Sequence, residues 1–431
     1  MFAMSTVAAP RLAIEGGPPA VQEALPGGLQ GVTDIGQAEI DAVTEVLRRK
    51  TIFRFLNDEK VSESARLEAA WREMCKVPHA LALGGGGTGA LICALVGLGI
   101  GTGDEVIIPG YTYIATAAAC LTVGAIPVLA EIDQSLTIDP ADIEKRITPH
   151  TRAIIPVHMR GTPCDMDGVM DIARRHKLKV LEDCAQANGA SYKGRPVGSI
   201  GDAGAFSLQH YKVITAGEGG IVTTHDTRVY RRAAMKHDSA MQFWRESEDW
   251  ETFAGENYRM CELRAALGLA QMQRMPRILE KCRAAKRGLR AATAGLRYLI
   301  PQPLPCDEGD IGVTFAFFLR TADAARAFSE ALSAEGVPNG TIYNKLIPDR
   351  HIYCHWDYVM EKRTSDPSGW PWNAAHRPIE YRRDMLPRTL DILGRCISIA
   401  LSQHWTGRHV EMVAGAIRKV HDALAAAGKL S

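Results

Sequence analysis

The stretch that decides the fold is 179–225, KVLEDCAQANGASYKGRPVGSIGDAGAFSLQHYKVITAGEGGIVTTH. It contains three short apolar runs, which we expect to be strands over 179–184, 203–208 and 219–225. Continuous apolar runs, rather than alternating ones, are typical of strands that helices cover on both faces of a sheet. The stretch therefore predicts the interior of an open, mostly parallel α/β sheet.

Strand and helix candidates also alternate on the N-terminal side of this stretch. We expect further strands at 105–109, 126–132 and 153–158, and helices at 114–123 and 165–176. Such alternation is typical of a large α/β domain, to which we assign residues 36–290. An irregular N-terminal arm rich in Gly, Pro and Ala precedes it at residues 1–35.

The pattern changes after a largely helical stretch at 262–296, in which Pro276 predicts a break. The elements expected beyond it are a strand at 314–320, a helix around 325–332, a strand at 396–401 and an amphipathic helix over 410–424. These elements predict a smaller α+β domain at residues 291–431.

Composition excludes several classes of protein. The 431 residues include 50 Lys and Arg and 49 Asp and Glu, a net charge of +1, which gives no reason to expect nucleic acid or a membrane as partner. The longest nearly apolar run, Gly89–Ile100, is shorter than the roughly 20 residues of a spanning helix. The N-terminal sequence lacks the pattern of a secretory signal. The ten cysteines form no CxxC pair, and several lie within apolar runs, as is typical of reduced thiols in the cytoplasm.

A glycine-rich turn, GGGGTG at Gly84–Gly89, precedes an Ala- and Leu-rich stretch that we expect to be a helix. Free N–H groups and the positive end of the helix dipole make such a turn a phosphate site. The turn also satisfies the G-x-G-x-x-G pattern of dinucleotide sites, which have an acidic residue about 20 positions further on, near Asp104 and Glu105. A dinucleotide, the single phosphate of another cofactor and a turn without ligand are all compatible with these residues.

Two charged residues follow the expected strands. Asp183 lies at the carboxyl end of one strand, the edge at which open α/β sheets bind ligands. It is either a ligand for a cationic group or the cap of the next helix. Lys212 lies between a strand and the turn Gly217–Gly220, GEGG, where the backbone can approach a ligand closely. Most lysines, however, are solvated surface charges.

In this order and spacing, the segments resemble the DegT/DnrJ/StrS family of pyridoxal-phosphate aminotransferases, which act mainly on keto-sugars. The resemblance runs from about Ala13 to the end of the smaller domain. It is carried by PGYTYIATA at 109–117, PVHMRG at 156–161, LEDCAQANGASYKGRPVGSIGDAGAFS at 181–207, Lys212 with GEGG, and NYRMCELRAALGLAQM at 257–272. The layout around Thr51–Asn57 and Tyr343–Trp356 is most similar to the branch that aminates C8 of oxidised 3-deoxy-manno-octulosonate.

The resemblance implies a fold type I transferase, built as a homodimer with active sites at the interface, that binds pyridoxal 5′-phosphate (PLP). It implies that Lys212 forms the internal aldimine and moves the proton, and that Asp183 faces the pyridinium nitrogen. The further cofactor contacts that it implies are Gln186 on the ring hydroxyl side, Tyr113 stacked on the ring, and, at the phosphate, Ser207, the amides of Gly87, Thr88 and Gly89, and Asn257 from the neighbouring subunit.

Candidate substrate contacts are His158 in the PVHMRG segment, together with Arg54, Tyr343 and His355. His351 and His355 have a metal-ligand spacing but lack the Glu of a zinc-protease helix, so we expect no metal. The function that the resemblance implies is transfer of an amino group from glutamate or glutamine to a keto-sugar or keto-cyclitol by a ping-pong mechanism. The alternatives are an NAD(P)-dependent oxidoreductase that uses GGGGTG, and a non-catalytic, regulatory member of the family.

Overall fold

The computed structural model of the chain describes residues 11–56, 58, 60–244, 251–342 and 348–431. Its centre is a seven-stranded sheet in the order β1-β9-β8-β5-β4-β2-β3. The strands are β1 (His79–Leu83), β2 (Glu105–Pro109), β3 (Ile126–Ala130), β4 (Thr151–Ile154), β5 (Lys179–Asp183), β8 (Ala203–Ser207) and β9 (Gly220–Thr224). Strands β2, β3, β4, β5 and β8 pair in parallel, and β9 pairs antiparallel with β8 and β1. The expected mostly parallel sheet is confirmed.

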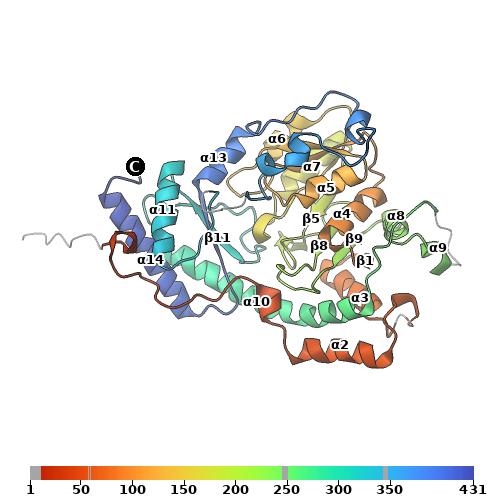
Figure 1. The fold of residues 1–431 in the computed structure, drawn as a ribbon, viewed down its shortest axis with the longest axis horizontal. Coiled ribbons are helices and arrows are strands. Elements are labelled where there is room, and N and C mark those ends of the chain that lie inside the picture. The colour runs from red at the N-terminus through yellow and green to blue at the C-terminus, as the bar shows by residue number, and fades with distance from the viewer. Residues whose placement is uncertain (1–10, 57, 59, 245–250, 343–347) are drawn as a thin grey trace, which may run out of the picture.

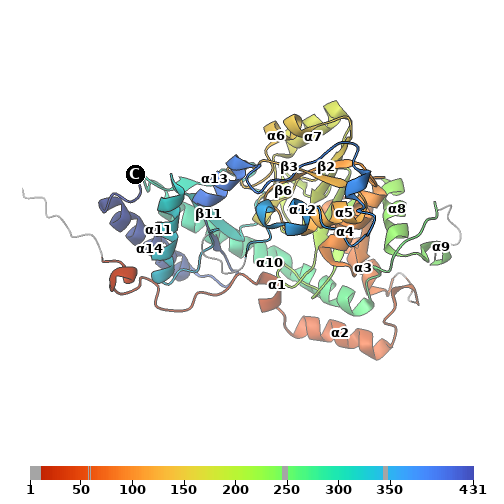
Figure 2. The same ribbon diagram turned by 45° about the horizontal axis from the view of Figure 1, so that its top comes forward.

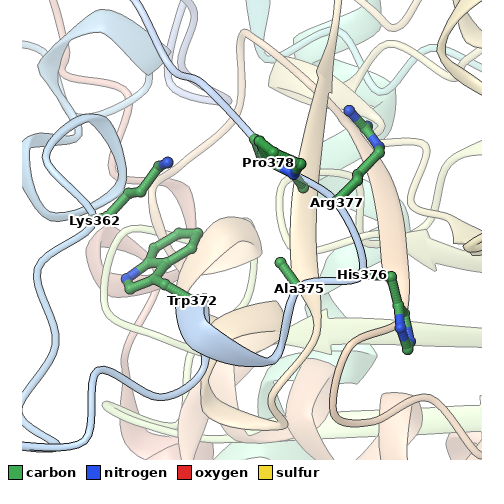
Figure 3. Close-up of a pocket in the computed structure, with 7 residues that line it drawn as sticks. Lys362, Trp372, Ala375, His376, Arg377 and Pro378 are labelled. Atoms are coloured by element: carbon green, nitrogen blue, oxygen red, sulfur yellow. The ribbon is translucent and has the colours of Figure 1, made fainter.

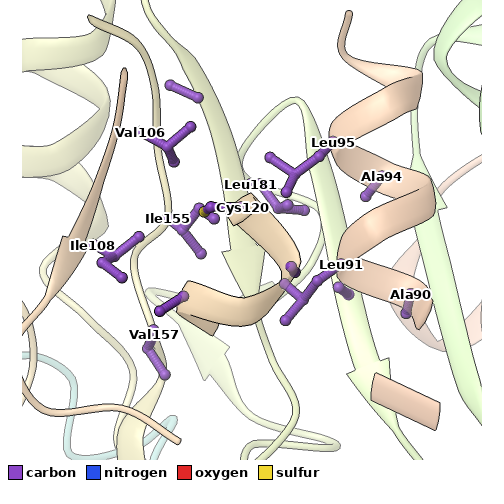
Figure 4. Close-up of a cluster of buried hydrophobic side chains, with 14 of the residues drawn as sticks. Ala90, Leu91, Ala94, Leu95, Val106, Ile108, Cys120, Ile155, Val157 and Leu181 are labelled. Atoms are coloured by element: carbon purple, nitrogen blue, oxygen red, sulfur yellow. The ribbon is translucent and has the colours of Figure 1, made fainter. Parts of the chain in front are cut away.

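Helices cover both faces of this sheet (Figure 1). One face packs against α4 (Gly86–Gly97), α5 (Ala115–Thr122) and α8 (Thr227–His237). The other face packs against α3 (Glu63–Cys75), α6 (Pro140–Arg146), α7 (Met166–His176) and α10 (Glu262–Thr293). In Figure 4, Leu91 and Leu95 of α4 lie near Leu181 of β5, in a core that fixes the start of α4 relative to the strand ends.

Proline has opposite consequences at two positions. Strand β4 ends at Ile154 rather than continuing to residue 158, because Pro156 has no N–H for the ladder. The sequence also predicted a break at Pro276, and this was wrong, since α10 is one continuous helix of 32 residues. Its first half packs on α2 (Gln37–Arg49) and α3, and its second half packs on α14 (Gly407–Ala426). These tertiary contacts keep the helix continuous although Pro276 cannot donate a backbone hydrogen bond.

A second, three-stranded sheet contains β10 (Ile300–Pro301), β11 (Thr314–Phe318) and β12 (Cys396–Ala400). Together with α11 (Ala322–Ala334) and α14 it encloses a separate core, which also buries Leu12 and Val21 of the N-terminal segment. Figures 1 and 2 show α10 extending from this core to the large sheet. The boundary predicted at residue 290 lies near the end of that helix and stays a prediction.

The remaining elements are short. They are η1 (Ala13–Glu15), α1 (Gln30–Thr33), η2 (Arg54–Leu56), η3 (Met159–Gly161), β6 (Ser191–Tyr192), β7 (Arg195–Pro196), α9 (Met241–Trp244), η4 (Tyr353–His355), α12 (Asp357–Met360), η5 (Trp372–Ala374) and α13 (Pro387–Arg395). Within the described ranges, none of the helices is long and apolar enough to cross a lipid bilayer.

Candidate active site

The carboxylate of Asp183 lies at the carboxyl end of β5 and is buried. Its Oδ1 accepts the N–H of Ala185 at 3.1 Å, and its Oδ2 accepts the hydroxyl of Thr116 at 2.8 Å. Because Thr116 gives its only proton to Asp183, the hydroxyl of Thr112, 2.7 Å away, must donate to Thr116. Burial raises the pKa of Asp183, against the two hydrogen bonds and the nearby charge of Lys212. The hydrogen bonds thus fix the orientation of the Asp183 carboxylate, and its ionised form needs a cationic partner.

Lys212 lies in the loop between β8 and β9. Its backbone N–H donates to the carbonyl of Gln209 at 2.9 Å, and its carbonyl accepts the N–H of Gly31 at 3.3 Å. Burial lowers the pKa of Lys212, while the charges of Asp183 and Glu218 oppose that shift. The Nζ has no hydrogen bond or ion pair within the described part of the chain. A lysine with a lowered pKa supplies the neutral amine that acts as nucleophile or base.

Helix α4 starts at Gly86, and its first turn faces the end of β8. The N–H groups of Gly86, Gly87 and Thr88 have no acceptor among the described residues, as is usual at a helix start. A Cβ on Gly87 would lie 2.9 Å from the Cβ of Ser207, so only glycine fits there. The sequence suggested Gly89 as another donor, but its N–H bonds to the carbonyl of Gly85 at 3.0 Å, as the first bond of the helix.

Ser207 and Gln186 lie at the same edge of the sheet. Ser207 ends β8, and its buried Oγ accepts the N–H of Gln209 at 3.3 Å. Gln186 follows β5, and its Oε1 accepts the backbone N–H of Arg160 at 3.2 Å. Ser207 thus faces Gly87 at the start of α4, and Gln186 lies three residues after Asp183.

Tyr113 and Asn257 are exposed in the single chain. Tyr113 exposes 49% of its surface, and its ring lies 5.3 Å from that of His351. Asn257 pairs through its backbone with Asp238, and its side chain is exposed. The contacts expected of Tyr113 with the cofactor and of Asn257 across a subunit interface are both compatible with this exposure.

Two expected substrate contacts are instead engaged inside the chain. The buried Arg54 donates to both carboxylate oxygens of Glu68, at 2.9 and 3.0 Å. His158 is fully buried, with Nε2 3.1 Å from Glu182 and Nδ1 accepting the N–H of Cys164 at 3.0 Å. Both side chains are engaged by buried partners within the chain, so the structure does not offer them to a substrate.

The environment of Glu182 explains the position of His158. Glu182 precedes Asp183 on β5, so its side chain points to the opposite face of the sheet. Its Oε1 accepts the N–H groups of Ile200 and Gly201 at 2.7 and 2.8 Å. His158, Glu182 and Cys184 form a buried group with metal-ligand atoms, but the first two bond to one another. We interpret the group as a hydrogen-bond network that fixes β5.

The other two expected substrate contacts are in the segment after β11. His355 is half-buried, and its Nδ1 lies 3.0 Å from the carbonyl of Asp349. Its role stays a prediction. Tyr343 lies outside the described residues.

Replacing Arg54 tests its reassignment. Arg54→Gln leaves Glu68 buried without its cation, which we expect to lower the free energy of unfolding by about 3 kcal/mol. Arg66→Gln removes an exposed arginine from the buried Glu63, which still pairs with Arg49, and should change it by less than about 1 kcal/mol. Urea unfolding measures both values. A raised KM for the acceptor at unchanged stability would restore Arg54 as a substrate contact.

A surface pocket of about 350 Å³ lies in the segment 362–379. Figure 3 shows Lys362 and Trp372 on one side of it and His376 and Arg377 on the other. None of the residues that line it is an expected site residue. The candidate catalytic and cofactor-binding groups therefore lie at the strand ends rather than in this pocket.

Comparison with known proteins gives a family match over most of the chain. A model of the DegT/DnrJ/EryC1/StrS aminotransferase family matches residues 33–368. GDP-perosamine synthase of Caulobacter vibrioides is 46% identical over 48% of this chain and 56% of that protein. L-glutamine:2-deoxy-scyllo-inosose aminotransferase of Micromonospora echinospora is 40% identical over 52% of this chain and 56% of that protein. The chain thus spans about half the length of these two relatives.

A further relative matches over a longer stretch. UDP-N-acetyl-3-dehydro-alpha-D-glucosamine 3-aminotransferase of Acidithiobacillus ferrooxidans is 38% identical over 68% of this chain and 78% of that protein. Among solved structures, an aminotransferase from Psychrobacter cryohalolentis is 29% identical with a TM-score of 0.74, covering 94% of this chain and 99% of that one. DesV of S. venezuelae is 29% identical with a TM-score of 0.72, covering 89% and 94%. The expected fold class is confirmed.

Proposed function

The chain belongs to the DegT/DnrJ/EryC1/StrS aminotransferase family, and on that premise we propose that it transfers an amino group from glutamate or glutamine to a keto-sugar or keto-cyclitol, with PLP as cofactor. Donor and acceptor react in turn at one site. The observation that carries the proposal is the meeting of Asp183, Lys212 and the start of α4 at one edge of the sheet. Three relatives are named for sugar or cyclitol chemistry, one of them with glutamine as donor, which supports the substrate class.

The residues fit the chemical parts of PLP. The free N–H groups of Gly87 and Thr88, beside the hydroxyl of Ser207, would hold the phosphate. Because Gly87 has no Cβ, its backbone can lie close to the hydroxyl of Ser207, so that both could contact one phosphate. Asp183 would face the ring nitrogen, and Lys212 the aldehyde. Gln186, Tyr113 and the partner's Asn257 would complete the pocket.

When bound, the cofactor supplies the electron sink for the carbanion that forms as the amino group moves. Asp183 would pair with the positive charge on the ring nitrogen, and its carboxylate would then be held in the ionised form that burial opposes. Thr116 and the N–H of Ala185 hold the carboxylate in one orientation. Lys212 takes and returns a proton at Nζ, and its lowered pKa favours the neutral form that accepts one.

The two alternatives lack support at the residues that they require. Glu105, near the position of a ribose-binding acid, instead accepts the guanidinium of Arg377 at 2.6 and 3.2 Å and the hydroxyl of Thr148 at 2.7 Å. Asp104 accepts the N–H of Gly101 at 2.9 Å. A regulatory member needs no reactive amine, whereas Lys212 is half-buried, with a lowered pKa, within the electrostatic influence of Asp183.

We further propose a homodimer with shared active sites. The segment 35–61 exposes large apolar side chains at 44–72% of their surface: Ile35, Ile40, Leu47, Ile52, Leu56 and Val61. The helical spacing of Ile40 and Leu47 predicts an apolar face, and α2 presents it on the outside of the single chain (Figure 1). A second copy is the partner that would cover it and bring Asn257 to the neighbouring site. Sedimentation equilibrium should give twice the chain mass of 46.9 kDa.

The ten cysteines support a reducing compartment. All ten are free thiols in the structure, and seven of them are buried: Cys75, Cys93, Cys120, Cys164, Cys184, Cys282 and Cys396. Burial raises the pKa of these seven. Unreactive reduced thiols fit the cytoplasm, where we propose that the enzyme works.

A mass-spectrometric screen tests the proposed function. PLP-loaded protein is incubated with isotope-labelled glutamine or glutamate and a panel of keto-sugars and keto-cyclitols. We expect the label in the amino group of at least one acceptor. Labelling of none, together with oxidation of a panel member that requires a nicotinamide cofactor, would contradict the proposal in favour of the oxidoreductase.

The phosphate site has its own test. Gly87→Ala adds a Cβ 2.9 Å from that of Ser207, so the amide or the hydroxyl must move. Since hydrogen bonds to charged groups contribute about 1.5–3 kcal/mol, we expect PLP affinity to fall about ten- to a hundred-fold. Gly415→Ala is the control, because a Cβ there meets nothing within 4 Å. Fluorescence titration gives both dissociation constants, and an unchanged value for Gly87→Ala would remove this turn from the site.

A further inference from the structure

Arg160 has an unusual backbone next to the proposed cofactor pocket. It lies in η3 with φ 51° and ψ 30°, a left-handed conformation that few residues other than glycine adopt. Its backbone N–H donates to Oε1 of Gln186 at 3.2 Å, which fixes Arg160 beside the ring-hydroxyl side of that pocket. Backbone conformations of this kind concentrate at functional sites.

The guanidinium of Arg160 is only partly engaged. Its Nε donates to the hydroxyl of Tyr111 at 2.6 Å, and its central carbon lies 5.8 Å from the centre of that ring. Tyr111 is 4% exposed, so it holds the guanidinium in one place. The two terminal amino groups have no hydrogen bond or ion pair in the part of the chain that the structure describes. A partly buried cation with free N–H donors is a site for an anion.

Arg160 lines a cavity of about 30 Å³ together with Tyr111, Asp349, Ile352 and Ser398. That volume holds about two water molecules, which is the size of a carboxylate group. Asp349 is the acid in the lining, and its Oδ1 accepts the backbone N–H and the Nδ1–H of His351 at 3.1 and 2.8 Å.

The cavity adjoins the residues proposed to hold the cofactor. The ring of His351 lies 6.5 Å from that of Tyr111 and 5.3 Å from that of Tyr113. On the other side, Gln186 bonds to Arg160 itself. An anion on the guanidinium is therefore bound beside the reacting centre rather than at a separate surface site.

We propose that Arg160 binds the carboxylate of the amino donor, a role that rests on the proposed function. Every α-amino acid has a carboxylate on the carbon that bears its amine, and the 2-oxo acid product keeps it. A keto-sugar or keto-cyclitol offers hydroxyls at the corresponding positions. The planar guanidinium fork matches a carboxylate through two parallel hydrogen bonds, which gives one site both affinity for the donor and a means of releasing its product.

The test compares two donors that differ only in this group. L-glutamine carries the carboxylate, and L-glutaminol replaces it with an alcohol. In the PLP-loaded enzyme, Arg160→Gln should lower the preference for glutamine over glutaminol about ten- to a hundred-fold, read from the cofactor absorbance in single-turnover reactions. It should weaken the binding of succinate, an unreactive dicarboxylate, by a similar factor in calorimetry.

Two further variants complete the design. Arg160→Lys keeps the charge without the fork and should recover part of the preference. Arg382→Gln removes an arginine whose side chain is 68% exposed and should match the wild type. An equal loss with glutamine and glutaminol, or unchanged succinate binding in Arg160→Gln, would overturn the proposal. A wild-type protein that takes nitrogen from no amino acid would contradict the proposed function instead, and succinate binding would still report on Arg160.

Discussion

Lys212→Ala is expected to abolish covalent capture of PLP and to lower kcat by about 10⁴-fold or more. The Nζ belongs to a half-buried lysine whose pKa is lowered by desolvation and raised by the charge of Asp183, and no described residue bonds to it. Removing it removes both the attachment point and the group that moves the proton. Activity with the loaded enzyme and the absorbance of bound PLP are the two measurements.

The control for this prediction is Lys281→Ala, which changes an exposed lysine of α10 and should leave both readouts unchanged. A small primary amine such as methylamine should restore part of the turnover of Lys212→Ala, because it supplies the missing base. Near-normal turnover of the variant without added amine would contradict the role of Lys212.

Asp183→Asn is expected to slow the reaction with the amino donor by about 10³-fold. Two opposite charges about 4 Å apart attract by about 4 kcal/mol at an effective dielectric constant of about 20. At about 1.36 kcal/mol per pKa unit, this attraction raises the pKa of the ring nitrogen by about three units. An amide keeps the shape of the carboxylate but not its charge, so the ring nitrogen loses its proton and electron withdrawal weakens.

A second effect distinguishes the loss of the Asp183 charge from damage to Lys212, because the reactivity of Lys212 should rise while turnover falls. Asp183 raises the pKa of Lys212, so Asp183→Asn lowers it further and leaves more of the amine neutral. The rate at which an amine-directed reagent modifies Lys212 in the PLP-free protein should therefore rise near neutral pH, while turnover falls. Asp171→Asn, at a surface carboxylate, should change neither. Turnover of Asp183→Asn within about tenfold of the wild type would contradict the assigned role.

The sequence predicted the parts of the site that depend on local pattern. Asp183 and Ser207 end apolar strands, and the carboxyl ends of parallel strands meet at one edge of the sheet. Gly87 lies in the first turn of a helix that directly follows a strand. These positions follow from where elements begin and end, which periodicity, proline and glycine mark in the sequence.

The sequence could not predict the partners of buried polar side chains. The sequence predicted Arg54 and His158 as substrate contacts. Nothing in the sequence indicates that their partners Glu68 and Glu182 are buried. Which face of β5 each carboxylate takes decides that Glu182 binds His158 while Asp183 faces the site. Arg160 lies in the same motif as His158, but the sequence alone did not predict a role for it. Its signal was a cation followed by glycine at a strand end on the binding edge of the sheet.

The most direct test of the central claim is the position of the covalent link to PLP. The wild-type protein is loaded with PLP, reduced with borohydride so that the link becomes permanent, digested and mapped by mass spectrometry. We expect the added mass on the peptide that contains Lys212. A label on another lysine, or no label on a protein that still transfers amino groups, would contradict the account.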